Sequence, residues 1–217
     1  MLLLAFDTAT AATSVAVHDG TTVVGRGAAE GAMAHGELLA PAIQAALRDA
    51  GVRPTDLTDV AVGVGPGPFT GLRVGVVTAL TLAETLGLQA HGVCTLDVSA
   101  AEAASGSTGE FVVATDARRK EVYWARYGPD GSRRDGPGVD RPATVAALGL
   151  PVVGRGARLY ADVFGLTEDA AELGPLDPSA GVLADLVAGG RHESLPLEPL
   201  YLRRPDAVPQ VPAAPPA

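Results

Sequence analysis

The residues most able to do chemistry in this chain are four histidines and one cysteine, and their spacing supports neither a metal site nor a nucleophile. The histidines are His18, His35, His91 and His192. No two of them stand four residues apart, the spacing that places two imidazoles on one helical face to hold a metal. Cys94 ends an apolar run, and no Gly-x-Ser-x-Gly sequence forms a nucleophile elbow. From the spacing of these histidines and this cysteine we predict no catalytic residue and no metal ligand.

A Gly/Pro-rich turn in the centre of the chain could in principle bind an anion. Gly65-Pro66-Gly67 stands between an apolar run and a helical pattern, where backbone N–H groups can point at a phosphate. Pro66 and Pro68 lack an N–H group, however, and no lysine follows as in a P-loop. We interpret this segment as a rigid turn. Gly154-Arg155-Gly156 is likewise interpreted as a strand-to-helix connection rather than an adenosine pocket.

The helix predicted at 72–86 carries apolar residues on nearly every side; Thr70 is placed to cap its beginning, and Gly87 supplies its stop. Such a helix is either central in its own domain or covered on its second face by a partner. A second apolar helix is predicted at 36–50. If a partner covers the second face, the residues expected to bind it through these two helices are Leu38, Leu39, Ile43, Leu72, Val76, Ala79, Leu80 and Ala83.

The overall charge argues against a broad nucleic-acid surface. The chain has a formal net charge of −9 over 217 residues, whereas nucleic-acid binding depends on neutralising phosphates. Arg118, Arg119 and Lys120 form the main basic cluster, for which a solvated turn is the more common explanation. Any RNA contact is therefore expected to be local or supplied by a partner. The apolar start of the chain reads as a first strand, neither a signal peptide nor a membrane span.

The order of elements suggests two related halves. An apolar strand, an acid, a polar turn and an alternating strand occur first at 2–18 and again at 111–127. We predict an N-terminal lobe at 1–106, a smaller C-terminal lobe at 107–204 and a disordered Pro/Ala tail at 205–217. Residues 128–142 are expected to be rich in loops, and 157–164 to form a helix.

One loop resembles a known phosphate-binding element. Asp7-Thr8-Ala9-Thr10 lies between two predicted strands and resembles the first phosphate loop of the actin-like kinases. That resemblance makes Asp7, Thr8 and Thr10 candidate nucleotide-binding residues. Ala9 stands where a glycine would let the backbone approach a phosphate. A hairpin loop with an acid at the strand end is common, so a purely structural loop remains the alternative.

Longer motifs resemble the TsaB (YeaZ) family over roughly residues 1 to 204. They are Phe6-Asp7-Thr8-Ala9-Thr10, His35-Gly36-Glu37-Leu38-Leu39, Gly65-Pro66-Gly67-Pro68-Phe69-Thr70-Gly71-Leu72-Arg73-Val74-Gly75, Asp116-Ala117-Arg118-Arg119-Lys120-Glu121-Val122-Tyr123 and Pro199-Leu200-Tyr201-Leu202-Arg203. The resemblance implies an α/β, actin-like (ASKHA, ribonuclease H-like) fold of two related lobes with mixed sheets flanked by helices.

The same resemblance implies a non-catalytic, cytoplasmic subunit in the synthesis of threonylcarbamoyladenosine at tRNA adenosine 37. Its expected partners are the transferase TsaD, bound through N-lobe helices, and the ATPase TsaE, with tRNA contacted indirectly. It implies no cofactor, and a homodimer when TsaD is absent. The alternative is an autonomous nucleotide- or metal-dependent enzyme of the actin-like kinase or M22 glycopeptidase type. The chain lacks the histidine pair that holds metal in the catalytic paralogue, which argues against that alternative.

Overall fold

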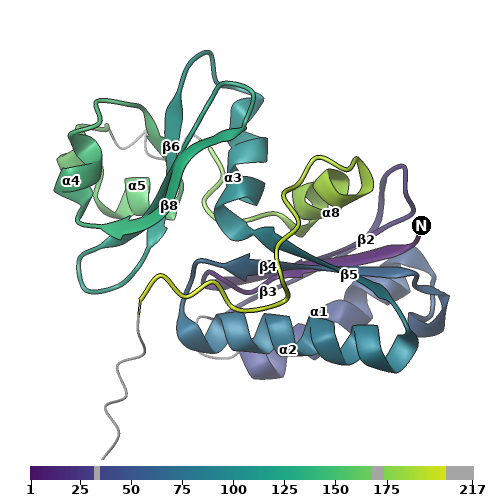
Figure 1. Cartoon of the computed structure of the whole chain (residues 1–217). Coiled ribbons are helices and arrows are strands. Elements are labelled where there is room, and N and C mark those ends of the chain that lie inside the picture. Colours follow the sequence, from purple (N-terminus) through teal and green to yellow (C-terminus); the bar gives the residue numbers. More distant parts are fainter. Residues whose placement is uncertain (32–34, 168–173, 204–217) are drawn as a thin grey trace, which may run out of the picture.

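The computed structural model describes residues 1–31, 35–167 and 174–203, which form two β-sheets covered by helices (Figure 1). We call each sheet with its helices a lobe. The strands of the first sheet precede α3 (Thr95–Ala104), and those of the second sheet follow it. The tail predicted at 205–217 lies outside the described residues.

The first sheet has five strands in the order β3-β2-β1-β4-β5. They are β1 (Leu3–Asp7), β2 (Ala12–His18), β3 (Val23–Glu30), β4 (Asp59–Gly65) and β5 (Gln89–Cys94). β1 pairs antiparallel with β2 and parallel with β4, so Leu3 faces His18 on one side and Asp59 on the other. The parallel strands β4 and β5 explain why the apolar run before the central turn carries so little charge, because both of its faces are covered.

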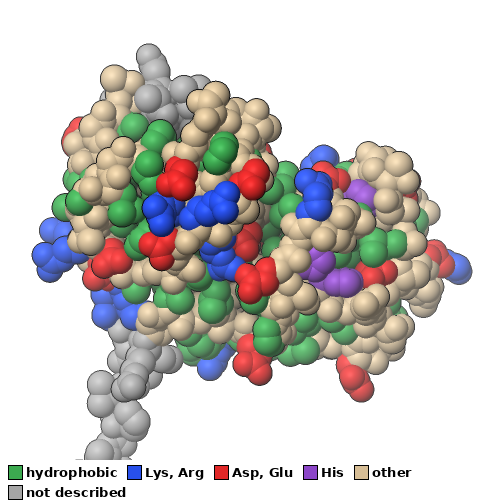
Figure 2. Space-filling model, turned by 45° about the horizontal axis from the view of Figure 1, so that its top comes forward, with side chains coloured by type: hydrophobic (Ala, Val, Ile, Leu, Met, Phe, Trp, Pro, Cys, Tyr) green, Lys and Arg blue, Asp and Glu red, His purple; other side chains and the backbone are tan. Residues whose placement is uncertain are grey.

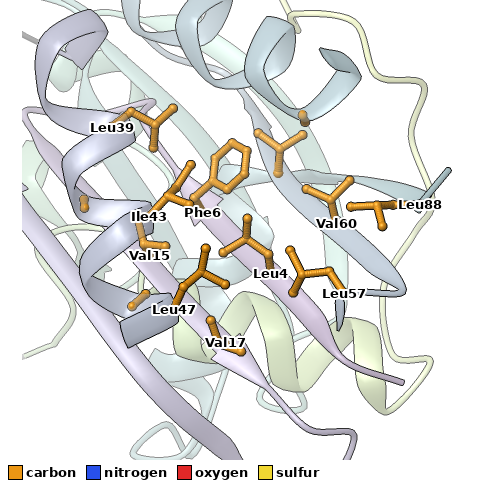
Figure 3. Close-up of a cluster of buried hydrophobic side chains, with 14 of the residues drawn as sticks. Leu4, Phe6, Val15, Val17, Leu39, Ile43, Leu47, Leu57, Val60 and Leu88 are labelled. Carbon is orange, nitrogen blue, oxygen red and sulfur yellow. The ribbon is translucent and has the colours of Figure 1, made fainter. Parts of the chain in front are cut away.

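Two cores sandwich this sheet. One face packs against α1 (His35–Ala50) and α2 (Phe69–Leu86), and it includes Leu4, Phe6 and Val60 (Figure 3). The other face packs against α3 and α8 (Ala180–Ala188), and it includes Leu3 and Ala5. Alternate residues of β1 thus serve opposite cores, as the two-residue period of a strand requires.

The second sheet repeats the order of the first, as β8-β7-β6-β9. Its strands are β6 (Phe111–Asp116), β7 (Val122–Tyr127), β8 (Arg133–Asp140) and β9 (Val152–Val153), and the short helices α4 (Pro142–Ala146), α5 (Arg155–Leu159) and α6 (Ala161–Phe164) accompany it. As in the first sheet, a central strand ending in an aspartate pairs antiparallel with the next strand and parallel with a later one. The expectation of two related lobes is confirmed.

Three local predictions were wrong. Residues 128–142 contain β8, which the charges and the Gly136-Pro137-Gly138 sequence concealed; β8 lies at the sheet edge, where a proline is tolerated. The helix expected at 157–164 is two short helices that meet at Tyr160. Thr70 was expected to cap the central helix but lies inside α2, which begins at Phe69; Gly87 does end it, in a left-handed conformation with φ 68°.

The end of the chain returns to the first lobe. α8 packs on β1 and β2, and its Asp185 lies 3.1 Å from Nε2 of His18. Further on, Leu195 bridges to Gly92 of β5, and the Leu200 N–H donates to the Val64 carbonyl at 2.8 Å. These contacts bear on the boundary of the C-terminal lobe that was predicted at 107–204. We propose that α8 and residues 195–200 belong to the first lobe.

Candidate functional site

The loop after β1 is closed by its own hydrogen bonds. Oδ1 of Asp7 accepts from the Ala9 N–H at 2.7 Å, and Oδ2 accepts from the Thr95 hydroxyl at 2.8 Å. The side chain is fully buried, and burial raises the pKa of Asp7 to about 6 against the lowering effect of these two bonds. Asp7 thus ties β1 to the beginning of α3.

The neighbouring threonines also face the protein interior. The Thr8 hydroxyl donates to the Gly71 carbonyl at 2.8 Å, which fixes the loop to the first turn of α2. Thr10 is buried, and its hydroxyl has no hydrogen-bond partner in the described part of the chain. A Cβ atom on Gly67 would lie 2.4 Å from the Ala9 carbonyl oxygen, so the Gly/Pro turn packs directly on this loop. A nucleotide would reach Asp7, Thr8 or Thr10 only if the loop opened.

The predicted partner-binding residues separate into two groups. Five of the eight lie in the core of this chain and cannot contact a partner in this fold: Leu39, Ile43, Leu72, Val76 and Ala79. Their assignment to a partner surface was wrong, because the apolar pattern could not show which side of each helix the sheet covers. The other three remain at the surface: Leu38 and Ala83 are partly buried, and Leu80 is exposed.

The exposed side of α2 forms one stripe along the helix. We call it the α2 face; its residues, spaced three or four apart, are Phe69, Arg73, Val77, Leu80 and Glu84. Val77 is 57% exposed and Leu80 46% exposed, high values for large aliphatic side chains. By length and composition α2 could cross a membrane, yet its opposite side packs on β4. The helix is therefore apolar on both a buried side and an open one.

The beginning of the α2 face holds the C-terminal segment. Phe69 and Tyr201 stack with their ring centroids 5.0 Å apart, and the Arg73 guanidinium lies 3.9 Å from the centre of the Phe69 ring. Nε of Arg73 also donates to the Tyr201 hydroxyl at 3.0 Å. This cluster joins the start of α2 to the last described residues.

A cavity of about 420 Å³ lies between α3, α8 and the β7–β8 turn. Asp97, Arg133 and Glu193 line it, and Arg133 pairs with both carboxylates. The Tyr127 hydroxyl donates to Asp97 at 2.8 Å, and burial raises the pKa of Asp97. These charged groups satisfy one another. In the described ranges, no group of three His, Cys, Asp or Glu side chains is placed to hold a metal.

The geometry defines a class of protein. Two lobes share the same strand order, each with an aspartate at the end of its central strand before a turn, and this arrangement is the actin-like fold. A Pseudomonas aeruginosa structure described as similar to the peptidase YeaZ superimposes with a TM-score of 0.76 at 29% identity, covering 93% of this chain and 99% of that one.

Relatives narrow this class to one family. The model described as "TsaD: tRNA N6-adenosine threonylcarbamoyltransferase" matches residues 29–170. Escherichia coli "tRNA threonylcarbamoyladenosine biosynthesis protein TsaB" is 41% identical over 140 residues, which cover 60% of this chain and 56% of that protein. The chain belongs to the TsaB (YeaZ) family, which shares its fold with the TsaD transferases.

Two mycobacterial relatives carry no functional name. An uncharacterized Mycobacterium tuberculosis protein is 44% identical over 213 residues, covering 95% of this chain and 94% of that protein. An uncharacterized Mycobacterium leprae protein is 43% identical and covers 96% of this chain, which spans only 56% of the length of that relative.

Proposed function

We propose that this chain is a non-catalytic subunit of tRNA threonylcarbamoyladenosine biosynthesis, which binds a TsaD transferase and activates it. The observation that carries the proposal is the α2 face. Val77 and Leu80 stand open on a helix whose other side is packed, and exposed apolar side chains gathered on one face mark interaction sites. The pathway in the proposal, tRNA threonylcarbamoyladenosine biosynthesis, is taken from the names of the Escherichia coli and Bacillus subtilis relatives.

The partner is inferred from shared fold. The transferase model matches residues 29–170, which include both α1 and α2. A partner of that family presents corresponding helices, so the two α2 faces can meet about a pseudo-twofold axis. The partly buried Leu38 and Ala83 lie at the margin of this contact. Without TsaD the same face is expected to pair with a second copy of this chain, giving a homodimer.

The internal bonding of the candidate nucleotide loop supports a non-catalytic role. Asp7 and Thr8 serve the fold through Thr95 and Gly71. The thiol of Cys94 is no better placed, because burial raises its pKa to about 12 and keeps it protonated at neutral pH. The proposal includes TsaE as a third component, tRNA bound mainly through TsaD, and a cytoplasmic location.

Co-purification with the TsaD of the same organism tests the proposal, followed by transfer assays with threonylcarbamoyl-AMP and tRNA. Each subunit is assayed alone and in combination. We expect a stable complex and a product that requires both proteins. Product from this chain alone, or nucleotide hydrolysis by it, would instead support an autonomous enzyme of the actin-like kinase or glycopeptidase type. A chain that neither binds TsaD nor changes the yield would refute the proposal.

A further inference from the structure

The turn between β6 and β7 has an unusual backbone. Arg118, Arg119 and Lys120 have φ angles of 61°, 54° and 61°, so three consecutive residues with side chains adopt the left-handed region. That conformation costs roughly 1–2 kcal/mol per residue other than glycine. Strained backbone of this kind is concentrated at functional sites.

Hydrogen bonds hold the strained turn in place. The Arg118 N–H donates to Oδ1 of Asp116 at 2.8 Å, and the Glu121 N–H donates to the Arg118 carbonyl at 3.0 Å. The side chains of Arg118, Arg119 and Lys120 are all exposed. The turn therefore presents three cations to solvent from a fixed backbone.

The C-terminal segment extends this basic surface to the α2 face. Arg203 pairs with Glu121, and its guanidinium donates to the Ala117 carbonyl at 3.1 Å, next to the turn. Tyr201 lies two residues earlier, within about 7 Å of chain, and contacts Arg73. The resulting strip consists of Arg73, Arg118, Arg119, Lys120, Tyr201 and Arg203. In Figure 2, Lys and Arg side chains lie along the lower edge of the second lobe, with Asp and Glu side chains between them.

The chemistry of this strip fits RNA. The strip carries five cations on a chain whose net charge is −9, and two of them are paired, Arg118 with Asp116 and Arg203 with Glu121. Guanidinium groups bind phosphates, and aromatic rings stack on unpaired bases. Tyr201 provides such a ring: it is 38% exposed, and Phe69 stacks on one of its faces.

We propose that this strip binds a single-stranded segment of the RNA substrate directly. The proposal rests on the proposed function in taking tRNA as that RNA. It assigns to this chain an RNA contact of its own, in addition to those of its partner. The strip begins where the α2 face begins, so an RNA bound on it lies beside the proposed subunit contact.

The test measures the affinity of a labelled, unmodified tRNA transcript for the full chain, alone and with its TsaD. The first variant combines Arg118→Asn and Lys120→Asn, because asparagine tolerates the left-handed conformation and so preserves the turn. The matched control combines Arg48→Asn and Arg53→Asn, which remove equal charge beside the opposite end of β4. Tyr201→Leu tests stacking separately.

We expect the turn variant to bind the transcript roughly tenfold more weakly than the control, with a slope of log affinity against log salt smaller by about 1.4 for two lost phosphate contacts. Tyr201→Leu should weaken binding several-fold with an unchanged slope. Equal affinities of the turn variant and the control would overturn the proposal, and they would leave the proposed function standing if both proteins still bind TsaD in size-exclusion chromatography.

The proposed function can also be refuted while RNA binding by the strip is still tested. If the wild-type chain does not bind TsaD, the proposed function is refuted. Photo-crosslinking of the transcript to the isolated chain then still tests whether the strip binds RNA. Crosslinks at Tyr201 that the turn variant loses and the control keeps would support the strip. Equal crosslinking of all three proteins would overturn it.

Discussion

Oδ2 of Asp7 accepts a hydrogen bond from the Thr95 hydroxyl at 2.8 Å, although the two residues are 88 positions apart in the chain. The bond joins the end of β1 to the first residue of α3, the helix that leads into the second lobe. Asp7, the acid of the loop that resembles a phosphate loop, therefore holds the beginning of α3, which connects the two lobes.

The buried carboxyl of Asp7 predicts a pH dependence of stability. In the folded protein Asp7 gains its proton as the pH falls through about 6, whereas its usual pKa is 3.8. Between these values the folded state binds more protons, so stability falls as the pH rises from about 4 to 6 and stays lower above that range. The contribution is on the order of 2–3 kcal/mol.

Urea unfolding of wild type and Asp7→Asn from pH 4 to 7 measures this contribution. The free energy of unfolding of the variant should rise relative to that of wild type across this range. Asp130→Asn is the control, because hydrogen bonds from Ser132 lower the pKa of this exposed carboxyl. A difference between Asp7→Asn and wild type that does not change with pH would show that Asp7 is ionised throughout.

Leu80→Arg is expected to abolish binding to TsaD and homodimer formation while leaving the fold intact. The side chain is 46% exposed in the single chain, so arginine meets solvent there, but in a helix-to-helix contact it would bury an unpaired charge. Size-exclusion chromatography with light scattering measures assembly, and circular dichroism measures the fold.

Leu159→Arg provides the matched control on α5 of the second lobe, where Leu159 is 54% exposed. It should assemble like wild type. Equal assembly of the Leu80 and Leu159 variants would exclude the α2 face as the contact.

Val76→Glu and Ala79→Arg should behave differently, although both residues lie on the same helix. Both side chains are buried within this chain, so either substitution places an ionised group in the apolar core. We expect destabilisation of at least about 3 kcal/mol and loss of soluble protein. Thermal unfolding of Val76→Glu beside Val77→Glu makes the comparison; a native Tm for the former would mean that the two sides of α2 are exchanged.

Gly75→Ala tests the close approach of α2 to the phosphate-loop segment. An added Cβ would lie 2.5 Å from the Thr8 hydroxyl oxygen, so it would break the bond from Thr8 to Gly71. The clash is expected to cost about 1–3 kcal/mol, more than the helix propensity gained.

Gly36→Ala is the control for this substitution, because its nearest neighbour is a Val74 methyl at 4.0 Å. It should be neutral or stabilise by up to about 1 kcal/mol. Chemical denaturation of both variants measures the difference, and equal stabilities would mean that Thr8 moves aside freely.

Several elements were already determined by the sequence. The uncharged run before the central turn predicted a buried strand, and Gly87 could adopt the left-handed conformation that ends α2 without strain. The repeated strand and acid at Asp7 and Asp116 predicted two related lobes. These features depend on residues that are neighbours in the chain, so their steric and hydrophobic patterns can be recognised from the sequence alone.

Other features were decided only by tertiary structure. Apolar residues on nearly every side of α2 left no period from which to read the buried stripe, so Val76 and Val77 looked equivalent until β4 covered one of them. The edge strand β8 lacked an apolar pattern, and α8 gave no sign that it packs on β1 rather than on the second sheet. The partners of Asp7 and Arg203 come from distant segments. Burial and pairing of this kind depend on which surfaces meet after folding, and contacts between residues far apart in the chain leave no local pattern.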